Sequence, residues 1–233
     1  MLLVVAAPAE ARAVRAGLVG GLGLPQKQPL AHPSPNWYWP LSALGADIDL
    51  LETGVGKANA AAAVAKRLDP SRHALVLNLG IAGSLPGPDR PSLGDSILAT
   101  TSLYADEGVL TPAGFQSIVE MGFPPGPLAG LAVPGTPDLL TALRPLAARA
   151  GPIATVSTCS GTDALAHEVA RRTGAIAEGM EGAAIAHTLA RLSPTIAFAE
   201  FRVISNTTGD RSEQQWDIRA AFDRLSALVA LLI

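Results

Sequence analysis

The chain has 233 residues, 48% of them apolar and 16% charged, and its formal net charge at pH 7 is −3. This length suits one domain with a substantial core, so we expect residues 1–233 to form a single domain. The small negative charge without a basic cluster disfavours a nucleic-acid partner, and the lack of an apolar run of about 18 residues disfavours a membrane span.

Short apolar runs alternate along the chain with longer segments of helical periodicity. The predicted strands are Leu2–Ala6, Ile48–Glu52, Ala74–Leu79, Ser96–Thr101, Ile153–Ser157, Ala175–Glu178 and Thr195–Ser205. The predicted helices are Ala9–Leu18, Ala58–Leu68, Asp163–Arg172, Gly182–Leu192 and Trp216–Leu232. Several of the strands are apolar throughout, as in sheets that are covered on both faces. This alternation predicts an α/β fold with a mostly parallel sheet and helices on both sides.

Two segments interrupt the alternation. Gly20–Pro40 is rich in Gly, Pro and aromatic residues, and Met121–Pro137 is rich in Gly and Pro. Neither has the high charge that is typical of disorder, so both are predicted to be ordered loops. The amino-terminal residues lack the basic start of a signal peptide, and Cys159, the only cysteine, cannot form an internal disulfide. Both features agree with a cytoplasmic location.

Two glycine-rich stretches raise the question of nucleotide binding. TGVGKANAA, residues 53–61, lacks the first glycine and the final Ser or Thr of a phosphate-binding loop, and also the third glycine of the dinucleotide-binding pattern. It indicates a strand-to-helix turn in which Gly54 and Gly56 permit a tight bend. LNLGIAGSL, residues 77–85, fits either a turn or a backbone surface that lies against a flat ligand.

Residue types that bind metals or act as nucleophiles are scattered. None of the four histidines pairs with another metal-binding residue one helical turn away, and the GxSxG signature of hydrolases is absent. Cys159 lies beside Ser and Thr residues at a predicted strand end, where a small buried thiol is more common than a nucleophile. The sequence therefore predicts neither a metal nor an organic cofactor.

Glu181 is a more informative residue. In EGMEGAAIAH, residues 178–187, it follows a predicted strand and falls in the first turn of an alanine-rich helix. The helix dipole is a common explanation for such a glutamate. This helix is so apolar, however, that its start is expected to be buried, and a buried carboxylate needs hydrogen-bond donors. The vicinal hydroxyls of a sugar are such donors.

The stretch FRVISNTTGD, residues 201–210, joins an apolar segment to Ser205, Asn206 and two threonines. Ligands of open α/β sheets bind at the carboxyl ends of the strands, so these polar residues are expected to face a pocket. A purely local role for Asn206 in a turn is the alternative, because Asn is frequent in turns.

Several motifs follow one another in an order that resembles a known superfamily. They are the Ala-x-x-x-Glu of residues 6–10, TGVGKANAA, NLGIAGSL followed by LGDSILAT, TVSTCSGT, EGMEGAA and EFRVISNTTGDR. On these motifs nearly the whole chain resembles the nucleoside phosphorylase and nucleosidase superfamily and, within it, the futalosine hydrolase family of menaquinone biosynthesis. The resemblance implies a single-domain, three-layer α/β/α sandwich around a mixed, mostly parallel sheet. It also implies a homo-oligomer, either a dimer or an assembly of dimers.

The resemblance further implies a nucleoside site that is shared among several strand ends. Glu10 matches the carboxylate that activates water in the nucleosidases, and Arg202 matches an arginine near that water and carboxylate. Met180 and Glu181 match a pair in which the Met packs on the ribose and the Glu binds its hydroxyls.

The base end of the implied site differs from that of adenine-cleaving nucleosidases. Ser205 and Asn206 stand where those enzymes have Ser-Asp, the Asp being the acid that protonates the leaving base. An Asn amide cannot supply a proton, but it can donate hydrogen bonds to a 6-oxopurine, whose Hoogsteen edge presents two acceptors. Asn206 therefore favours hypoxanthine. The backbone segment beside the base matches Ile81, Ala82 and Gly83, although those nucleosidases have Ser in place of Ile81.

The anion site distinguishes hydrolysis from phosphorolysis. Related phosphorylases hold phosphate with arginines near the first strand-to-helix turn and before the segment matching NLGIAGS, and this chain has no arginine at either place. A carboxylate at the first turn would repel phosphate, which favours water. The implied reaction is the hydrolysis of futalosine to hypoxanthine and dehypoxanthine futalosine. The alternatives are a methylthioadenosine/adenosylhomocysteine nucleosidase, a purine nucleoside phosphorylase, or a nucleoside-binding protein without turnover.

Overall fold

The structure, a computed structural model, describes residues 1–23, 38–40 and 47–233. Within these ranges nine strands form one sheet. They are β1 (Leu2–Val5), β2 (Tyr38–Pro40), β3 (Asp49–Glu52), β4 (Leu75–Ser84), β5 (Ser96–Tyr104), β8 (Ala132–Pro134), β9 (Arg149–Thr155), β10 (Ala177–Gly179) and β11 (Ala197–Thr207). A small second sheet consists of β6 (Gly108–Thr111) and β7 (Gly114–Ser117). The helices are α1 (Pro8–Leu22), α2 (Lys57–Arg67), α3 (Pro137–Leu143), the short 3-10 helix η2 (Arg144–Leu146), α4 (Asp163–Thr173), α5 (Gly182–Leu192) and α6 (Ile218–Leu231).

The large sheet is mixed. Its order is β10-β9-β5-β11-β4-β1-β3-β2, with β8 added beside β5. The central strands β3, β1, β4 and β11 run parallel to one another, whereas β5 is antiparallel to β11. Strand β10 pairs with both β9 and β4, so this end of the sheet curls back on itself. The structure confirms the predicted α/β fold with a mixed, mostly parallel sheet.

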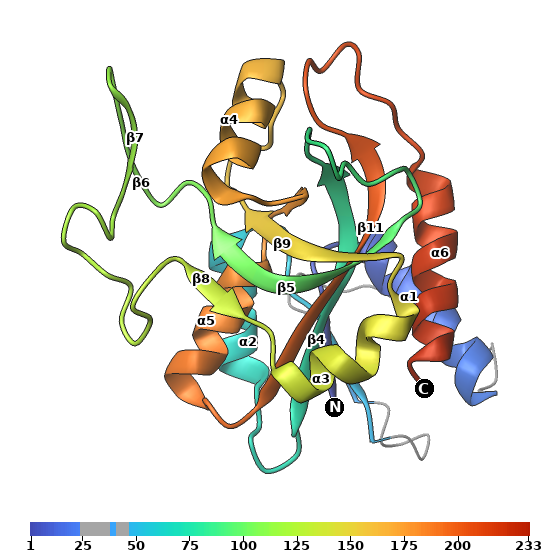
Figure 1. Ribbon diagram of the computed structural model, residues 1–233. Coiled ribbons are helices and arrows are strands. Elements are labelled where there is room, and N and C mark those ends of the chain that lie inside the picture. Colours follow the sequence, from blue (N-terminus) through green and yellow to red (C-terminus); the bar gives the residue numbers. More distant parts are fainter. Residues whose placement is uncertain (24–37, 41–46) are drawn as a thin grey trace.

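Helices cover both faces of the central strands (Figure 1). Successive side chains of a strand point to opposite faces, and β1 is apolar throughout because both of its faces are covered. Leu3 and Val5 pack in the cluster that includes residues of α1 and α6, whereas Leu2 and Val4 pack in the cluster that includes residues of α2 and α5. The apolar runs of the sequence therefore reflect a sheet between two helical layers.

Every predicted strand and helix occurs, but several elements and boundaries differ from the prediction. Met121–Pro137 was predicted as a loop and contains the edge strand β8, which backbone pairing with β5 holds in place. Gly20–Pro40 was also predicted as a loop, but its start belongs to α1 and its end forms β2; residues 24–37 lie outside the described residues. Strand β4 continues past its predicted end because β11 and β10 pair with the added residues.

The segment between β5 and β8 extends away from the body of the molecule as an arm that contains β6 and β7 (Figure 1). The arm exposes several large apolar side chains: Val109, Leu110, Met121 and Phe123. In the described part of the chain, none of the helices has the length and apolar character needed to cross a membrane.

Candidate active site

A cavity of about 440 Å³ lies at the carboxyl ends of β1, β4, β10 and β11. Its volume falls in the range typical of small-molecule sites. The cavity is lined by every residue that the sequence analysis placed in the site: Glu10, Ile81, Ala82, Gly83, Met180, Glu181, Arg202, Ser205 and Asn206. The fold thus brings together residues from four separate segments of the chain.

Glu10 sits in the first turn of α1, immediately after β1, and is only 4% exposed. One carboxylate oxygen accepts hydrogen bonds from the backbone N–H groups of Ala6 (2.9 Å) and Ala7 (3.0 Å), and the other accepts one from Ile81 N–H at 2.9 Å. Burial raises the pKa of this carboxyl, and the negative charge of Glu181 raises it further, against the lowering effect of Arg202. Glu10 is therefore firmly oriented and more basic than an ordinary glutamate.

Arg202 lies at the centre of a group of buried charges. It is 1% exposed, and it lies on the same face of β11 as Glu200. Its Nε donates to Glu200 Oε1 at 2.8 Å and its Nη2 donates to Glu181 Oε2 at 3.2 Å, while Nη1 lies 4.0 Å from Glu10 Oε1. Arg202 thus contacts Glu181 and Glu200 more closely than Glu10, although the resemblance had placed it beside Glu10.

Glu181 is the residue immediately before α5. It had been predicted to lie in the first turn of this helix. It is 4% exposed, which confirms that the start of α5 is interior. Its Oε1 accepts a hydrogen bond from Gly56 N–H at 3.0 Å. The turn between β3 and α2 therefore supports the site.

That turn has the geometry that its glycines were predicted to permit. Gly54 has a φ of 84° and Gly56 a φ of 98°, in the left-handed region that favours glycine. The turn was expected to be purely structural, and the N–H that it offers to Glu181 was not predicted. No local signal marks this contact, because 125 positions separate the two residues.

Ser205 and Asn206 lie at the end of β11, where its pairing with β4 shifts by one residue. Such a bulge redirects side chains beside a site. The Ser205 hydroxyl lies 3.0 Å from Asn206 Oδ1 and 3.3 Å from the carbonyl oxygen of Ala82. One hydrogen of the Asn206 amide donates to the carbonyl oxygen of Thr207 at 3.0 Å, so the second hydrogen is available to a ligand.

Other residues line the cavity that the sequence analysis did not assign to it. They include Val55, Ser160, Glu178, Gln214, Trp216 and Phe222. Glu178 was noted only as the end of a strand, yet it is 5% exposed and accepts hydrogen bonds from Ser160 N–H at 2.8 Å and from Ser160 Oγ–H at 2.6 Å. A carboxylate at the end of an otherwise apolar predicted strand was the signal that could have identified it.

The burial expected for Cys159 was wrong. This residue lines the cavity but is exposed, because it lies in the loop that follows β9. Partial withdrawal of its thiol from water raises the pKa, and the nearby charges of Glu178 and Glu181 raise it further. A raised pKa does not favour a nucleophilic role.

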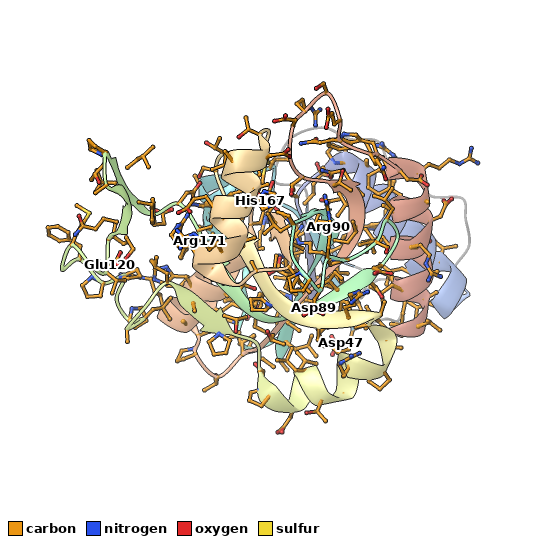
Figure 2. All side chains as sticks on the ribbon, turned by 45° about the horizontal axis from the view of Figure 1, so that its top comes forward. Asp47, Asp89, Arg90, Glu120, His167 and Arg171 are labelled. Carbon is orange, nitrogen blue, oxygen red and sulfur yellow. The ribbon has the colours of Figure 1, made fainter. Side chains whose placement is uncertain are left out.

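The charges of the cavity contrast with those elsewhere on the chain. Figure 2 labels six residues on the outside of the molecule, among them Glu120 of the arm and Arg171 of α4, and all six are exposed. Across residues 1–23, 38–40 and 47–233, no group of three or more His, Cys, Asp or Glu side chains is arranged to hold a metal ion. Inside the cavity, by contrast, buried carboxylates surround the buried guanidinium of Arg202.

Sequence comparison places this architecture in a family. Residues 6–233 match the profile of the phosphorylase superfamily. The chain belongs to this superfamily. It is 37% identical to the futalosine hydrolase of Acidothermus cellulolyticus over 99% of this chain and 89% of that protein. It is 35% identical to the futalosine hydrolase of Streptomyces coelicolor over 79% of this chain and 77% of that protein.

Solved structures of two nucleosidases share the fold. The 5'-methylthioadenosine/S-adenosylhomocysteine nucleosidase of S. pneumoniae, solved with the transition-state inhibitor MT-ImmA, has a TM-score of 0.71 and 21% identity over 99% of this chain and 98% of that one. The Neisseria meningitidis nucleosidase, solved with methylthio-immucillin-A, has a TM-score of 0.73 and 21% identity over 98% of this chain and 96% of that one. At this identity the likeness establishes the superfamily fold alone.

Proposed function

We propose that the protein hydrolyses the N-glycosidic bond of futalosine and releases hypoxanthine and dehypoxanthine futalosine, a step of menaquinone biosynthesis. The observation that carries this proposal is that Glu10, Glu181 and Asn206 line one cavity in a chain 37% identical to a futalosine hydrolase. Each of the three tasks in cleaving a nucleoside then has a side chain: activating water, holding the ribose and stabilising the departing base.

Glu10 is proposed to activate and position the attacking water. The water oxygen attacks the anomeric carbon, the bond from that carbon to the base breaks, and the bonding electrons leave with the base. Three backbone N–H groups occupy three of the roughly four acceptor sites of the Glu10 carboxylate, and the water proton passes to the remaining site on Oε1. Three backbone N–H groups fix this carboxylate, and a positioned general base typically contributes about 10²–10⁴-fold to the rate.

Glu181 and Met180 are proposed to hold the ribose. A carboxylate has about four acceptor sites, and the Glu181 carboxylate receives hydrogen bonds from Gly56 N–H and Arg202 Nη2. Its remaining sites suit two vicinal hydroxyls. Met180 lines the same cavity and is half-buried, so its thioether offers an apolar surface to the sugar.

The end of β11 is proposed to bind the base. The free amide hydrogen of Asn206 donates to an acceptor of the 6-oxopurine and so stabilises the negative charge that develops on hypoxanthine. Ser205 supports the orientation of this amide. The backbone of Ile81, Ala82 and Gly83 lies along the same cavity and forms a surface for the flat ring.

The charges of the cavity support water over phosphate as the nucleophile. Among the residues that the structure describes, Arg202 lies 4.0 Å from Glu10, and its guanidinium is already paired with Glu181 and Glu200. A phosphate placed beside Glu10 would meet buried carboxylates, and like charges repel strongly in a buried site. The same arrangement supports turnover over mere nucleoside binding, because Glu10 is buried and oriented beside the proposed ribose site.

Base release from three nucleosides tests the proposal. The protein would be incubated with futalosine, inosine and methylthioadenosine, each with and without phosphate, and the free bases separated by chromatography. We expect hypoxanthine from futalosine without phosphate. Release of hypoxanthine from inosine only with phosphate would instead identify a phosphorylase, and release of adenine would identify an adenine nucleosidase. No release from any of them would favour a binding protein.

We also propose that the protein acts in the cytoplasm as a homo-oligomer, a dimer or an assembly of dimers. The exposed apolar side chains of the arm, Leu110 and Phe123 among them, support a subunit contact, because large exposed apolar patches commonly mark interfaces. Light scattering of the purified protein would measure its mass. A monomer at micromolar concentration would contradict this proposal.

A further inference from the structure

One buried carboxylate of the cavity has no task in the mechanism proposed above. Glu178 is 5% exposed and lines the cavity. Unlike Glu10, Glu181 and Glu200, it forms no ion pair with any residue that the structure describes. Burial of a carboxylate without a cation is costly unless hydrogen-bond donors surround it, so the partners of this group indicate what it binds.

Ser160 supplies two of these donors from the protein. Its N–H donates to Glu178 Oε1 and its hydroxyl donates to Oε2. An ionised carboxylate offers about four acceptor sites, so each oxygen keeps one for a ligand. The two contacts also fix the carboxylate plane, which prepares the remaining sites for a donor of fixed direction.

Glu178 and Asn206 flank the same point of the backbone. Strand β10 pairs with β4 so that Glu178 lies opposite Gly83. A Cβ atom built on Gly83 would lie 3.3 Å from Asn206 Nδ2 and 3.5 Å from Glu178 Cγ. The amide donor and the carboxylate acceptor therefore converge on one end of the cavity, the end proposed for the base.

We propose that Glu178 accepts a hydrogen bond from the N1–H group of a 6-oxopurine base and so selects hypoxanthine over adenine. This inference rests on the proposed function. Hypoxanthine presents a donor at N1 and an acceptor at its 6-oxygen, whereas adenine presents an acceptor at N1 and a donor at its 6-amino group. A carboxylate facing N1 pairs with hypoxanthine and repels the lone pair of adenine.

The environment of Glu178 agrees with this role. Burial raises the pKa of its carboxyl and the charge of Asp106 raises it further, while the hydrogen bonds from Ser160 lower it. The hydrogen bonds from Ser160 thus only partly offset the cost of burying the charged carboxylate, and an N–H donor from a ligand would stabilise the charge further. Together with the amide of Asn206, one acceptor and one donor then match a 6-oxopurine at two edges of its ring system.

Calorimetric binding of free bases tests the inference without requiring turnover. Hypoxanthine, 1-methylhypoxanthine and adenine would be titrated into the wild-type protein, Glu178→Gln and Glu178→Ala. We expect wild type to prefer hypoxanthine over both other bases by about 10- to 100-fold, since hydrogen bonds to charged groups are the stronger class. In Glu178→Ala the preference for hypoxanthine over adenine should fall at least tenfold.

Glu178→Gln keeps the size of the side chain and separates hydrogen bonding from folding. Its carbonyl oxygen still accepts from N1–H of hypoxanthine, and its amide can donate to N1 of adenine. We therefore expect hypoxanthine affinity to stay within a few-fold of wild type and adenine affinity to rise at least tenfold. Glu107→Gln, which alters a carboxylate outside the cavity lining, should leave all three affinities unchanged.

Several results would overturn the inference. They are equal affinity of the wild type for hypoxanthine and 1-methylhypoxanthine, no binding of hypoxanthine, or an unchanged hypoxanthine-to-adenine ratio in folded Glu178→Gln. Hypoxanthine release from futalosine, measured separately, decides the proposed function. A protein that cleaves futalosine but shows no change in base preference in these variants would refute the role of Glu178 alone.

Discussion

Arg202 Nε donates to Glu200 Oε1 at 2.8 Å between two side chains on the same face of β11. Glu200 is fully buried and also accepts hydrogen bonds from Asn78 Nδ2 and from the Ser102 hydroxyl. Because the strand fixes the spacing of Glu200 and Arg202, the guanidinium is oriented before any ligand binds. It then presents its other nitrogens toward Glu181 and Glu10.

Loss of this guanidinium should destabilise the protein. Arg202→Met leaves three buried carboxylates without their cation, and breaking a buried ion pair by removing one partner typically costs about 3–5 kcal/mol. The measurement is the free energy of unfolding in urea. Arg211→Met, which replaces an exposed arginine that lines the same cavity, should cost less than about 1 kcal/mol, as is usual for surface charges. Equal stability of the two variants would contradict the central role of Arg202.

A methyl group at Gly80 should slow turnover strongly. A Cβ atom there would overlap both Arg202 Nη1 and Glu10 Oε1, so this glycine permits the two side chains to meet. Gly80→Ala should therefore lower kcat for base release by at least 100-fold, because small misplacements of reacting groups have effects of about this size. In Gly20→Ala the added methyl meets no atom within 4 Å, so that variant should keep full activity. Normal turnover in Gly80→Ala would show that Glu10 and Arg202 need not be in contact.

The fold was largely predictable from the sequence because its main elements follow local rules. The strand β1 is apolar throughout since both faces are covered, and α4 begins at a Thr162 cap and ends at a left-handed Gly174. The short strands β2 and β8 carry no such pattern. Strand β2 exists through pairing with β3 and strand β8 through pairing with β5, and the three residues of each are too few to show a periodic pattern.

The candidate site was predictable in part. Glu181 and Asn206 were indicated by their places beside strand ends and then by superfamily motifs, Glu10 by a superfamily motif alone, and Glu178 and Glu200 were missed. The partners of Glu200, Asn78 and Ser102, lie 122 and 98 positions away. Side chains that act through such long-range contacts leave no periodic signal in the chain, so their role required the structure.

The decline of activity at low pH should follow the protonation of the Glu10 carboxylate. The pKa of this carboxyl is raised, mainly by burial, and a general base must be ionised to act. Activity should therefore decline, as pH falls, at a value above the ordinary glutamate pKa of about 4.3. The charge of Glu181 contributes to the raised pKa, so Glu181→Gln should lower kcat/KM and also move the acid limb to lower pH. An acid limb that stays in place or moves to higher pH in Glu181→Gln would show that Glu10 is not the group whose protonation causes the decline.

Cys159 provides a chemical probe of occupancy. It is the only cysteine and it lines the cavity, with a thiol pKa that is raised by partial desolvation and nearby carboxylates. Alkylation by iodoacetamide at pH 7 should therefore be slower than that of the unfolded chain and should accelerate with pH, because the thiolate is the reactive form. Saturating hypoxanthine should slow the reaction at least fivefold. Mass spectrometry follows the modification, and equal rates with and without hypoxanthine would place the base elsewhere.

Asn206→Asp should shift the specificity of cleavage toward adenine nucleosides. The new carboxyl lies near the carboxylate of Glu178, and like charges together with burial favour the protonated form of one of them. A protonated carboxyl at this position can supply the proton that an amide cannot, and general acid catalysis typically contributes about 10²–10⁴-fold. We expect adenine release from methylthioadenosine to rise at least tenfold and hypoxanthine release from futalosine to fall. Asn206→Ala, which removes both donor and acid, should slow both reactions. Chromatography of the released bases checks these outcomes, and an unchanged ratio of adenine to hypoxanthine release in Asn206→Asp would exclude residue 206 as the group that stabilises the leaving base.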